Sequence, residues 1–323
     1  MEWGVVRTKP IGRTHGIELP VFIDNFAHHY TTVRVYSDGL IDCWFFLGCV
    51  DLSFVRRKIE EGWIVTQAPA GAVVSFANLG WATVGNCNWQ YTTADFVKRV
   101  EKAIETLNPS RHGLVDMNGE DVEIRDGIRY KKFGFANGRP YFTDADKNEV
   151  LGASMPVFVA VGSETYLSRW FVYADGSSRI GPRSVLSSVD EIAERLVGGD
   201  LATSVPNGAW INIEGVGRFR AQKGVWVVKP GERAREALDK LEVLRGGIGS
   251  FQRCWNRFLE YQSAPCMEAR EVLRQAYESV PEHLRPDLGD TDSQDWHIRK
   301  ILYGRENWTG ELAFRRHPPP PDY

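Results

Sequence analysis

The sequence lacks several features that would assign it to a class at once. No stretch approaches the ~20 consecutive apolar residues of a membrane-spanning helix, and the N-terminus has no apolar segment of signal-peptide length. A formal net charge of −3 provides no excess of positive charge for a nucleic-acid backbone. We therefore expect a cytoplasmic protein that has no membrane association and whose net charge does not indicate nucleic acid as a partner.

Cysteine is scarce, and the common catalytic motifs are missing. The five cysteines include no CxxC pair and are odd in number, which argues against a disulfide scaffold. Neither GxxxxGK[ST] nor GxSxG occurs, and no His pair at i, i+4 encloses a Glu. A phosphate-binding loop, a serine-hydrolase elbow and a zinc site would each need one of these patterns, so we expect no metal and no cofactor.

The strongest positive signal is an internal duplication. The segment Val35–Gly39 (VYSDG) recurs as Val172–Gly176 (VYADG), and Trp89 recurs as Trp226. These pairs share one spacing, since 176 − 39 and 226 − 89 both give 137. The triplet VFI at residues 21–23 recurs as VFV at 157–159, at a spacing that is one residue shorter (136). The chain therefore contains two diverged copies of one unit.

Both copies predict the same succession of elements. An Asp-Gly pair between β-branched and aromatic runs predicts a hairpin. Apolar residues at helical spacing follow it at 52–59 and 189–196, and a second helix is predicted at 96–107 and at its equivalent. The predicted fold class is α+β, with two tandem homologous domains, each an antiparallel sheet covered by two helices, plus a helical C-terminal region.

The predicted boundaries divide the chain into four parts. Residues 1–108 form the first repeat domain, whose residues 1–19 are an irregular or weakly strand-like lead-in, and residues 109–155 are a hairpin-rich linker insert. Residues 156–246 form the second repeat domain, and residues 247–323 form the helical C-terminal region with a Pro-rich tail.

A group of polar residues in the first copy has the composition of a covalent catalytic site. The candidates are His28, His29, Asp42, Cys43 and Cys49. A thiolate activated by an imidazole is a nucleophile. The second copy has Arg179, Ile180 and Leu186 in place of the aspartate and the two cysteines. Either one copy kept a site that the other lost, or these cysteines fill an apolar core, as free cysteines usually do.

Large aromatic residues are distributed unequally between the copies. Trp89 and Trp226 occupy equivalent positions and are therefore candidates for the core. Trp44, Trp63 and Trp81 have no aromatic counterpart, and exposed Trp residues often anchor binding partners. We predict a recognition surface built from some of these three residues; the alternative is that they cover the linker insert or the other copy.

Three functions remain open. The duplication, the aromatic asymmetry and the absence of a complete catalytic motif favour a non-catalytic intracellular binding protein, of a bacterial regulatory or immunity-like kind, whose partner is another protein. The first alternative is a hydrolase- or transferase-type enzyme that uses the Cys/His/Asp group. The second is a nucleic-acid or nucleotide-binding module in which aromatic strands stack on bases.

Overall fold

A computed structural model describes most of the 323-residue chain. The described residues are 4–9, 12–43, 49–112, 114, 122–125, 128–131, 141–143, 149–162, 164–181, 185–288 and 297–303.

The chain alternates short strands and helices, and the order repeats. The strands are β1 Gly4–Lys9, β2 Gly12–Asn25, β3 Ala27–Tyr36, β4 Ile41–Asp42, β5 Cys49–Val50, β6 Ile64–Val65, β7 Val73–Phe76, β8 Gly80–Trp89, β9 Val122–Arg125, β10 Ile128–Lys131, β11 Tyr141–Thr143, β12 Glu149–Val161, β13 Glu164–Tyr173, β14 Ser177–Ile180, β15 Ser187–Ser188, β16 Leu201–Ala202, β17 Trp210–Ile213 and β18 Gly217–Trp226. The helices are α1 Leu52–Glu60, α2 Thr93–Leu107, α3 Val189–Gly198, α4 Pro230–Leu244, α5 Ser250–Ser263, α6 Met267–Ser279, the 3-10 helix η1 Glu282–Leu288 and α7 His297–Tyr303.

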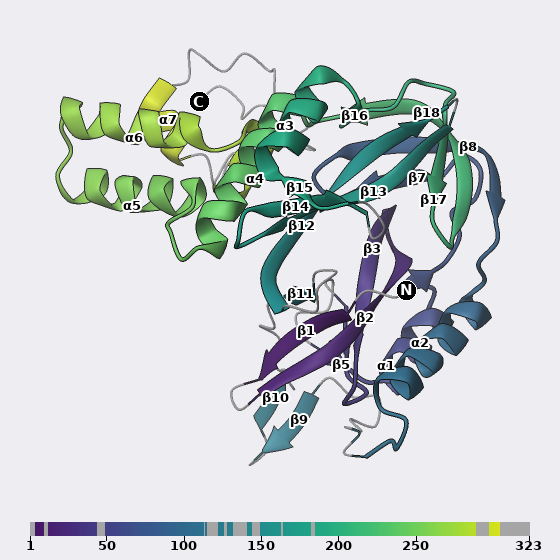
Figure 1. The fold of residues 1–323 in the computed structure, drawn as a ribbon. Helices are drawn as coiled ribbons and strands as arrows, with labels where there is room; N and C mark the ends of the chain where they lie inside the picture. The colour runs from purple at the N-terminus through teal and green to yellow at the C-terminus, as the bar shows by residue number, and fades with distance from the viewer. Residues whose placement is uncertain are drawn as a thin grey trace.

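Strands of both copies join one mixed sheet whose path closes on itself (Figure 1). From β13 the order is β17, β18, β8, β7, β3, β2, β1, β11 and β12, and β12 pairs again with β13. Most neighbours are antiparallel, but β7 runs parallel to β3 and β17 runs parallel to β13. Each parallel pair follows from a crossover that contains a helix, α1 in the first repeat and α3 in the second.

The helices begin at equivalent residues of the two copies. The N-cap of α1 is Asp51, whose side chain accepts from the Phe54 amide at 2.8 Å. The N-cap of α3 is Ser188, 137 positions later, and it forms a capping box with Glu191. Helices α1 and α2 lie together against the first repeat, and α3 and α4 against the second (Figure 1). Each repeat thus has its own pair of covering helices.

The two repeats are joined by antiparallel pairing between β8 and β18. Gly80 lies opposite Trp226, and its equivalent Gly217 lies opposite Trp89, which is the equivalent of Trp226. The same pair of residue types therefore faces across the strands at both ends. Val84 faces its own equivalent, Ala221. This reciprocal register places a pseudo-twofold axis at the Val84–Ala221 pair.

Backbone hydrogen bonds beyond the strand ends obey the same symmetry. The Gln90 amide donates to the Val216 carbonyl at 2.9 Å, and the Val227 amide donates to the Leu79 carbonyl at 2.8 Å. Gln90 is equivalent to Val227, and Leu79 is equivalent to Val216. Each repeat therefore donates one backbone hydrogen bond to the other from the same position. The sequence duplication is therefore a duplication of structure.

A core of aromatic rings spans the junction. Phe22 packs edge-on against Trp89 with ring centroids 5.6 Å apart, and the equivalent Phe158 packs against Trp226 at 5.1 Å. Phe76 of the first repeat stacks on Trp226 of the second at 6.1 Å. The largest buried cluster combines residues of both repeats, so burial of apolar surface couples their folding.

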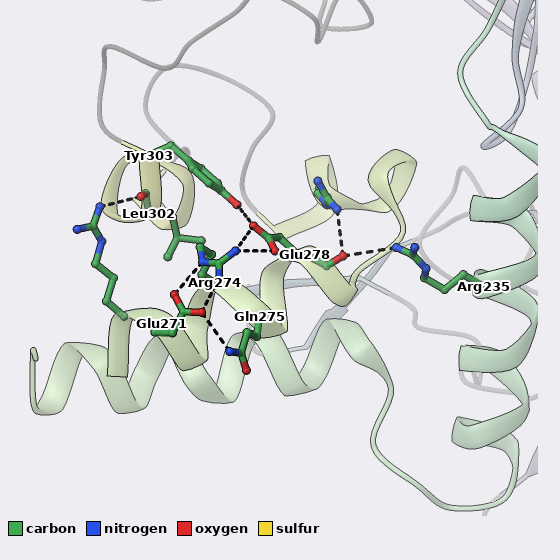
Figure 2. A network of polar contacts seen from close by, with 9 residues as sticks. Arg235, Glu271, Arg274, Gln275, Glu278, Leu302 and Tyr303 are labelled. Atoms are coloured by element: carbon green, nitrogen blue, oxygen red, sulfur yellow. Dashed lines mark hydrogen bonds and ion pairs between the residues drawn. The ribbon is translucent and has the colours of Figure 1, made fainter. Parts of the chain in front are cut away.

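The C-terminal helices form a separate apolar cluster beside α4 (Figure 1). Figure 2 shows polar contacts of this region: the Tyr303 hydroxyl of α7 donates to Glu278 of α6 at 2.8 Å, and within α6 Arg274 bridges Glu271 and Glu278. Arg235 of α4 reaches the Glu278 carbonyl at 3.5 Å. Exposed ion pairs contribute little to stability, so the apolar cluster holds the region together. Its buried members are Cys254, Phe258, Leu273, Tyr277, Val280, Leu288, Ile298 and Leu302.

The predicted α+β class, with two tandem repeats and a helical C-terminal region, is confirmed by this arrangement. Local details differ. Residues 1–19, predicted as an irregular or weakly strand-like lead-in, contain the regular strand β1 and the start of β2, because β1 pairs with β2 and with the distant β11. Strand β8 runs without interruption from Gly80 to Trp89, because β18 pairs with it along its length. Strand β11, in the segment predicted as a hairpin-rich linker insert, pairs with β12 and with the distant β1 and so joins the main sheet.

Gly80→Ala tests the close approach of the two repeats. A Cβ atom at Gly80 would lie 2.1 Å from the Val225 carbonyl oxygen, and the backbone φ there is +140°. We expect this substitution to lower the free energy of unfolding by more than about 3 kcal/mol, since it combines backbone strain with a backbone clash. Gly71→Ala is the control: its φ is +86° with nothing within 4 Å, so only about 1–2 kcal/mol is expected. Equal losses in urea titrations would contradict the close approach.

Candidate functional site: a polar cavity between the repeats

A cavity of about 500 Å³ opens between the first repeat and helix α4 of the second. Strand β3 provides one wall, the turn after β7 another, and β12, β13 and α4 close the cavity from the second repeat. Its lining residues are His29, Tyr30, Thr31, Thr32, Arg34, Asp42, Ser75, Ala77, Asn78, Ser154, Met155, Pro156, Arg169, Arg233, Glu236 and Lys240. Most of these residues are polar, and four of them are cationic.

Two arginines share one buried carboxylate at the first end of the cavity. Arg34 Nε lies 3.1 Å from Glu18 Oε1, and Arg169 Nη1 contacts Glu18 Oε2. Arg169 also donates to the Thr32 hydroxyl at 3.1 Å and to the Ser154 hydroxyl at 2.5 Å. Thr32 and Arg169 are themselves equivalent residues, 137 positions apart, so this end lies on the pseudo-twofold axis.

Two titratable groups near this end, Glu18 and Tyr30, have pKa values shifted away from neutrality. Burial alone would raise the pKa of Glu18, but the charges and hydrogen bonds of Arg169 and Arg34 outweigh it and lower that pKa below its usual range. Burial raises the pKa of the Tyr30 hydroxyl to about 12. Glu18 is therefore a fixed anion and Tyr30 a fixed neutral group at physiological pH.

At the second end, one buried carboxylate joins three parts of the chain. Glu236 of α4 forms ion pairs with Arg233 and with Lys240, whose Nζ lies 3.3 Å away, and it lies 2.8 Å from His283 Nε2 in η1. Arg233 in turn donates to the Asn78 carbonyl of the first repeat. Arg233 and His283 are fully buried and Glu236 nearly so. The cavity wall is thus also the anchor of the C-terminal region.

The environment keeps Glu236 ionised. Burial alone would raise the pKa of its carboxyl, but the His283 hydrogen bond and the charges of Arg233 and Lys240 lower that pKa to about 2. An uncompensated charge at this depth would be strongly destabilising. Glu236 is accordingly needed to neutralise Arg233.

The pseudo-twofold axis generates a second cavity of about 540 Å³ in the second repeat. Tyr166, Ser168, Asn212 and Glu214 line it at the positions that His29, Thr31, Ser75 and Ala77 occupy in the first cavity. Its charged lining consists of Glu214 and Arg218, the latter paired with Glu164 at 2.9 Å. The two cavities share equivalent positions of β3/β13 and β7/β17 and differ in charge; the helix that corresponds to α4 does not line the second.

The residues that the sequence suggested for catalysis are spread along the first repeat. Cys43 is 1% exposed and belongs to the apolar core, while the side chain of Cys49 lies outside the described residues. Asp42 lies opposite Arg34 and accepts from it at 3.4 Å. Arg34 and His29 are five residues apart on β3, roughly 17 Å at strand rise. Asp42 and His29 therefore line opposite ends of one cavity.

The histidines have local partners. His28 Nδ1 lies 3.9 Å from Asp24 Oδ1, and His29 Nε2 lies 3.1 Å from the Asn25 carbonyl. Neither of these contacts involves the Asp42–Cys43 segment. A catalytic role for the group stays a prediction.

Two tryptophans of the predicted recognition surface, Trp63 and Trp81, lie on different parts of the sheet in the described structure. Trp63 and Trp81 are each 38% exposed, but four inter-strand steps separate β8 from β6, roughly 19 Å. The Lys58 ammonium covers the Trp63 ring at 5.4 Å, and Trp44 lies outside the described residues. A shared recognition surface stays a prediction.

Sequence reasoning missed the cationic half of the cavity. Arg34, Arg169, Arg233 and Lys240 come from three separate elements, and helix α4 belongs to the other repeat. One signal was available: the equivalents of Arg34 and Arg233 in the other copy are Phe171 and Phe96. An apolar position that becomes charged in one copy only is typical of a surface that acquired a separate role.

The described residues contain neither a helix fit to span a membrane nor a cluster of metal-binding side chains. No helix in that part of the chain has the length and apolar content to cross a membrane. No group of three or more His, Cys, Asp or Glu side chains there is arranged to hold a metal ion.

Comparison with known families assigns the chain. The model of a family described as a domain of unknown function (DUF7638) matches residues 5–111 and 140–248. The chain belongs to this family. The DUF7638 match covers both repeats, and the model of a second domain of unknown function (DUF7639) matches residues 249–313, where α5 to α7 lie. No curated protein and no solved structure matches the chain.

Glu236→Gln tests the buried anchor of the DUF7638 cavity. The folded-state pKa of about 2 lies below the unfolded value, so the carboxylate stabilises the fold above about pH 4.5 and loses this effect as pH falls toward 2. We expect the variant to lose about 3 kcal/mol of unfolding free energy at pH 7 and clearly less at pH 3.5.

The matched control is Glu242→Gln on the same helix, where the carboxylate forms an exposed pair with Arg253. In urea titrations this variant should lose less than about 1 kcal/mol of unfolding free energy. A pH-independent loss of unfolding free energy for Glu236→Gln, or equal losses for both variants, would contradict the anchoring role of Glu236.

Proposed function

We propose that this protein is a non-catalytic binding protein and that the polar cavity between its repeats is the ligand site. The observation that carries the proposal is the electrostatic state of the cavity. Glu18, Glu236 and Tyr30 have pKa values displaced away from neutrality. General acid–base catalysis works best with groups that titrate near the working pH, whereas fixed charges and donors suit binding.

The position of the candidate nucleophile supports the same proposal. A reactive cysteine is partly exposed in an electropositive environment. Cys43 instead lies inside the apolar core with 1% of its surface accessible. This favours the interpretation that the thiol fills space.

The rigid setting of the cavity also suits recognition. Its walls come from two repeats joined by strand pairing and from α4, which the C-terminal region supports through His283. A pre-formed site loses little conformational entropy on binding. The protein partner expected from the sequence stays a prediction, with the exposed Trp63 and Trp81 as its candidate contacts.

A ligand-retention experiment separates binding from catalysis. The purified chain is incubated with a small-molecule extract of its source cells, and retained and released compounds are identified by mass spectrometry. We expect at least one compound to be retained unchanged by the wild type and by Cys43→Ser, and to be lost from Arg169→Thr. Thr is the residue at the equivalent position 32, which makes Arg169→Thr compatible with the local backbone.

Time-dependent conversion of a retained compound, in proportion to the amount of protein, would overturn the proposal. If Cys43→Ser abolished that conversion, the enzyme alternative would replace it. Unfolding curves of both variants establish that each remains folded.

A further inference from the structure

We infer that the cavity binds a small molecule carrying a carboxylate or a phosphate group. The inference rests on the proposed binding function and names its ligand class. Four cations line the cavity, namely Arg34, Arg169, Arg233 and Lys240. They face two lining carboxylates, Asp42 and Glu236, and the buried Glu18 behind them. Four cations against three carboxylates leave one positive charge in excess.

The duplication provides an internal control for what the fold requires. At the equivalent positions of the other copy, Arg34 is replaced by Phe171 of the second repeat, and Arg233 and Lys240 are replaced by Phe96 and Ala103 of the first. All three of these apolar residues are buried, with exposed fractions of 4% for Phe171, 0% for Phe96 and 3% for Ala103. The same backbone therefore packs well with apolar side chains at all three positions.

Cations at such positions are costly to the fold. Burying an ion pair is often no better for stability than an apolar pair of similar volume. Arg233 is fully buried where Phe96 packs in the other copy, so its charge is better explained by a ligand than by stability. The second cavity, with one cation and one carboxylate in its lining, shows no such excess.

Lys240 is the cation best placed to meet a ligand. Its side chain is 34% exposed, and its carboxylate contact, Glu236, is shared with Arg233 and His283. One carboxylate therefore faces two formal cations and an imidazole. An anionic group beside Lys240 would complete the charge balance of this end.

Hydroxyl groups at the other end add donors. Thr32 and Ser154 accept hydrogen bonds from Arg169. A hydroxyl that accepts a hydrogen bond can still donate its own proton, so both hydroxyls can donate to a ligand. Thr31 and Ser75 line the wall between the two ends. Together these groups fit a small anion that also carries hydroxyl groups.

A charge series of probes tests the inference on the full chain. Glycerol 3-phosphate and glycerate present the two anionic groups on similar skeletons, and glycerol lacks a charge. We expect isothermal titration calorimetry at low ionic strength to detect binding of at least one anion at millimolar concentration and no binding of glycerol. Added salt should weaken the binding, since screening reduces the attraction of partly exposed charges.

Lys240→Ala is the decisive variant, and Lys102→Ala is its matched control. Ala103 already occupies the equivalent of Lys240, and Lys102 is an exposed residue beside it on α2. We expect Lys240→Ala to weaken anion binding at least tenfold and Lys102→Ala to change it less than twofold. Equal effects of the two variants, binding of glycerol as tight as that of the anions, or binding of neither anion would overturn the inference.

The two proposals fail in different ways. A neutral or cationic compound retained in the cavity would overturn the anion class and leave the binding function standing. An anion that binds through Lys240 and is then converted would overturn the non-catalytic function and leave the anion class standing.

Discussion

The pairing of β8 with β18 is the constraint on which the rest of the structure depends. It fixes the pseudo-twofold axis at Val84 and Ala221, brings the aromatic residues of both repeats into one core and places α4 of the second repeat beside the turn after β7 of the first. The pairing is possible only because Gly80 and Gly217 leave room for the opposite backbone, with Val225 O and Asn88 O at the places where a Cβ would lie. The cavity exists where it does because those strands meet in that register.

Much of the fold was readable from the sequence because a duplication provides its own alignment. Apolar positions kept at helical spacing identified α1 and α3, and the Asp-Gly turns identified the hairpins. The joining of the repeats into one closed sheet was not readable, because it depends on long-range partners. Strand β11 lies between β1 and β12, and local residue patterns carry no information about such distant pairing.

The candidate site was less accessible to prediction. Sequence proximity drew attention to His28, His29 and Cys43, which the fold places along one strand and in the core. The cavity instead assembles Arg34, Arg169 and helix α4 from both halves of the chain. Spacing along a sequence reports on one element at a time, whereas a site at a junction depends on how elements meet. Comparing the two copies residue by residue is the one route from sequence that would have led there.

The contact between Thr32 and Arg169 has an evolutionary consequence. In a symmetric dimer of a single ancestral unit, the residue at this position would face its own copy across the axis. Two arginines there would repel each other, and two threonines would provide no cation. Covalent fusion of the two units removes that restriction, because each half can mutate alone. A guanidinium opposite a hydroxyl on the axis is therefore a feature that a homodimer of identical chains cannot encode.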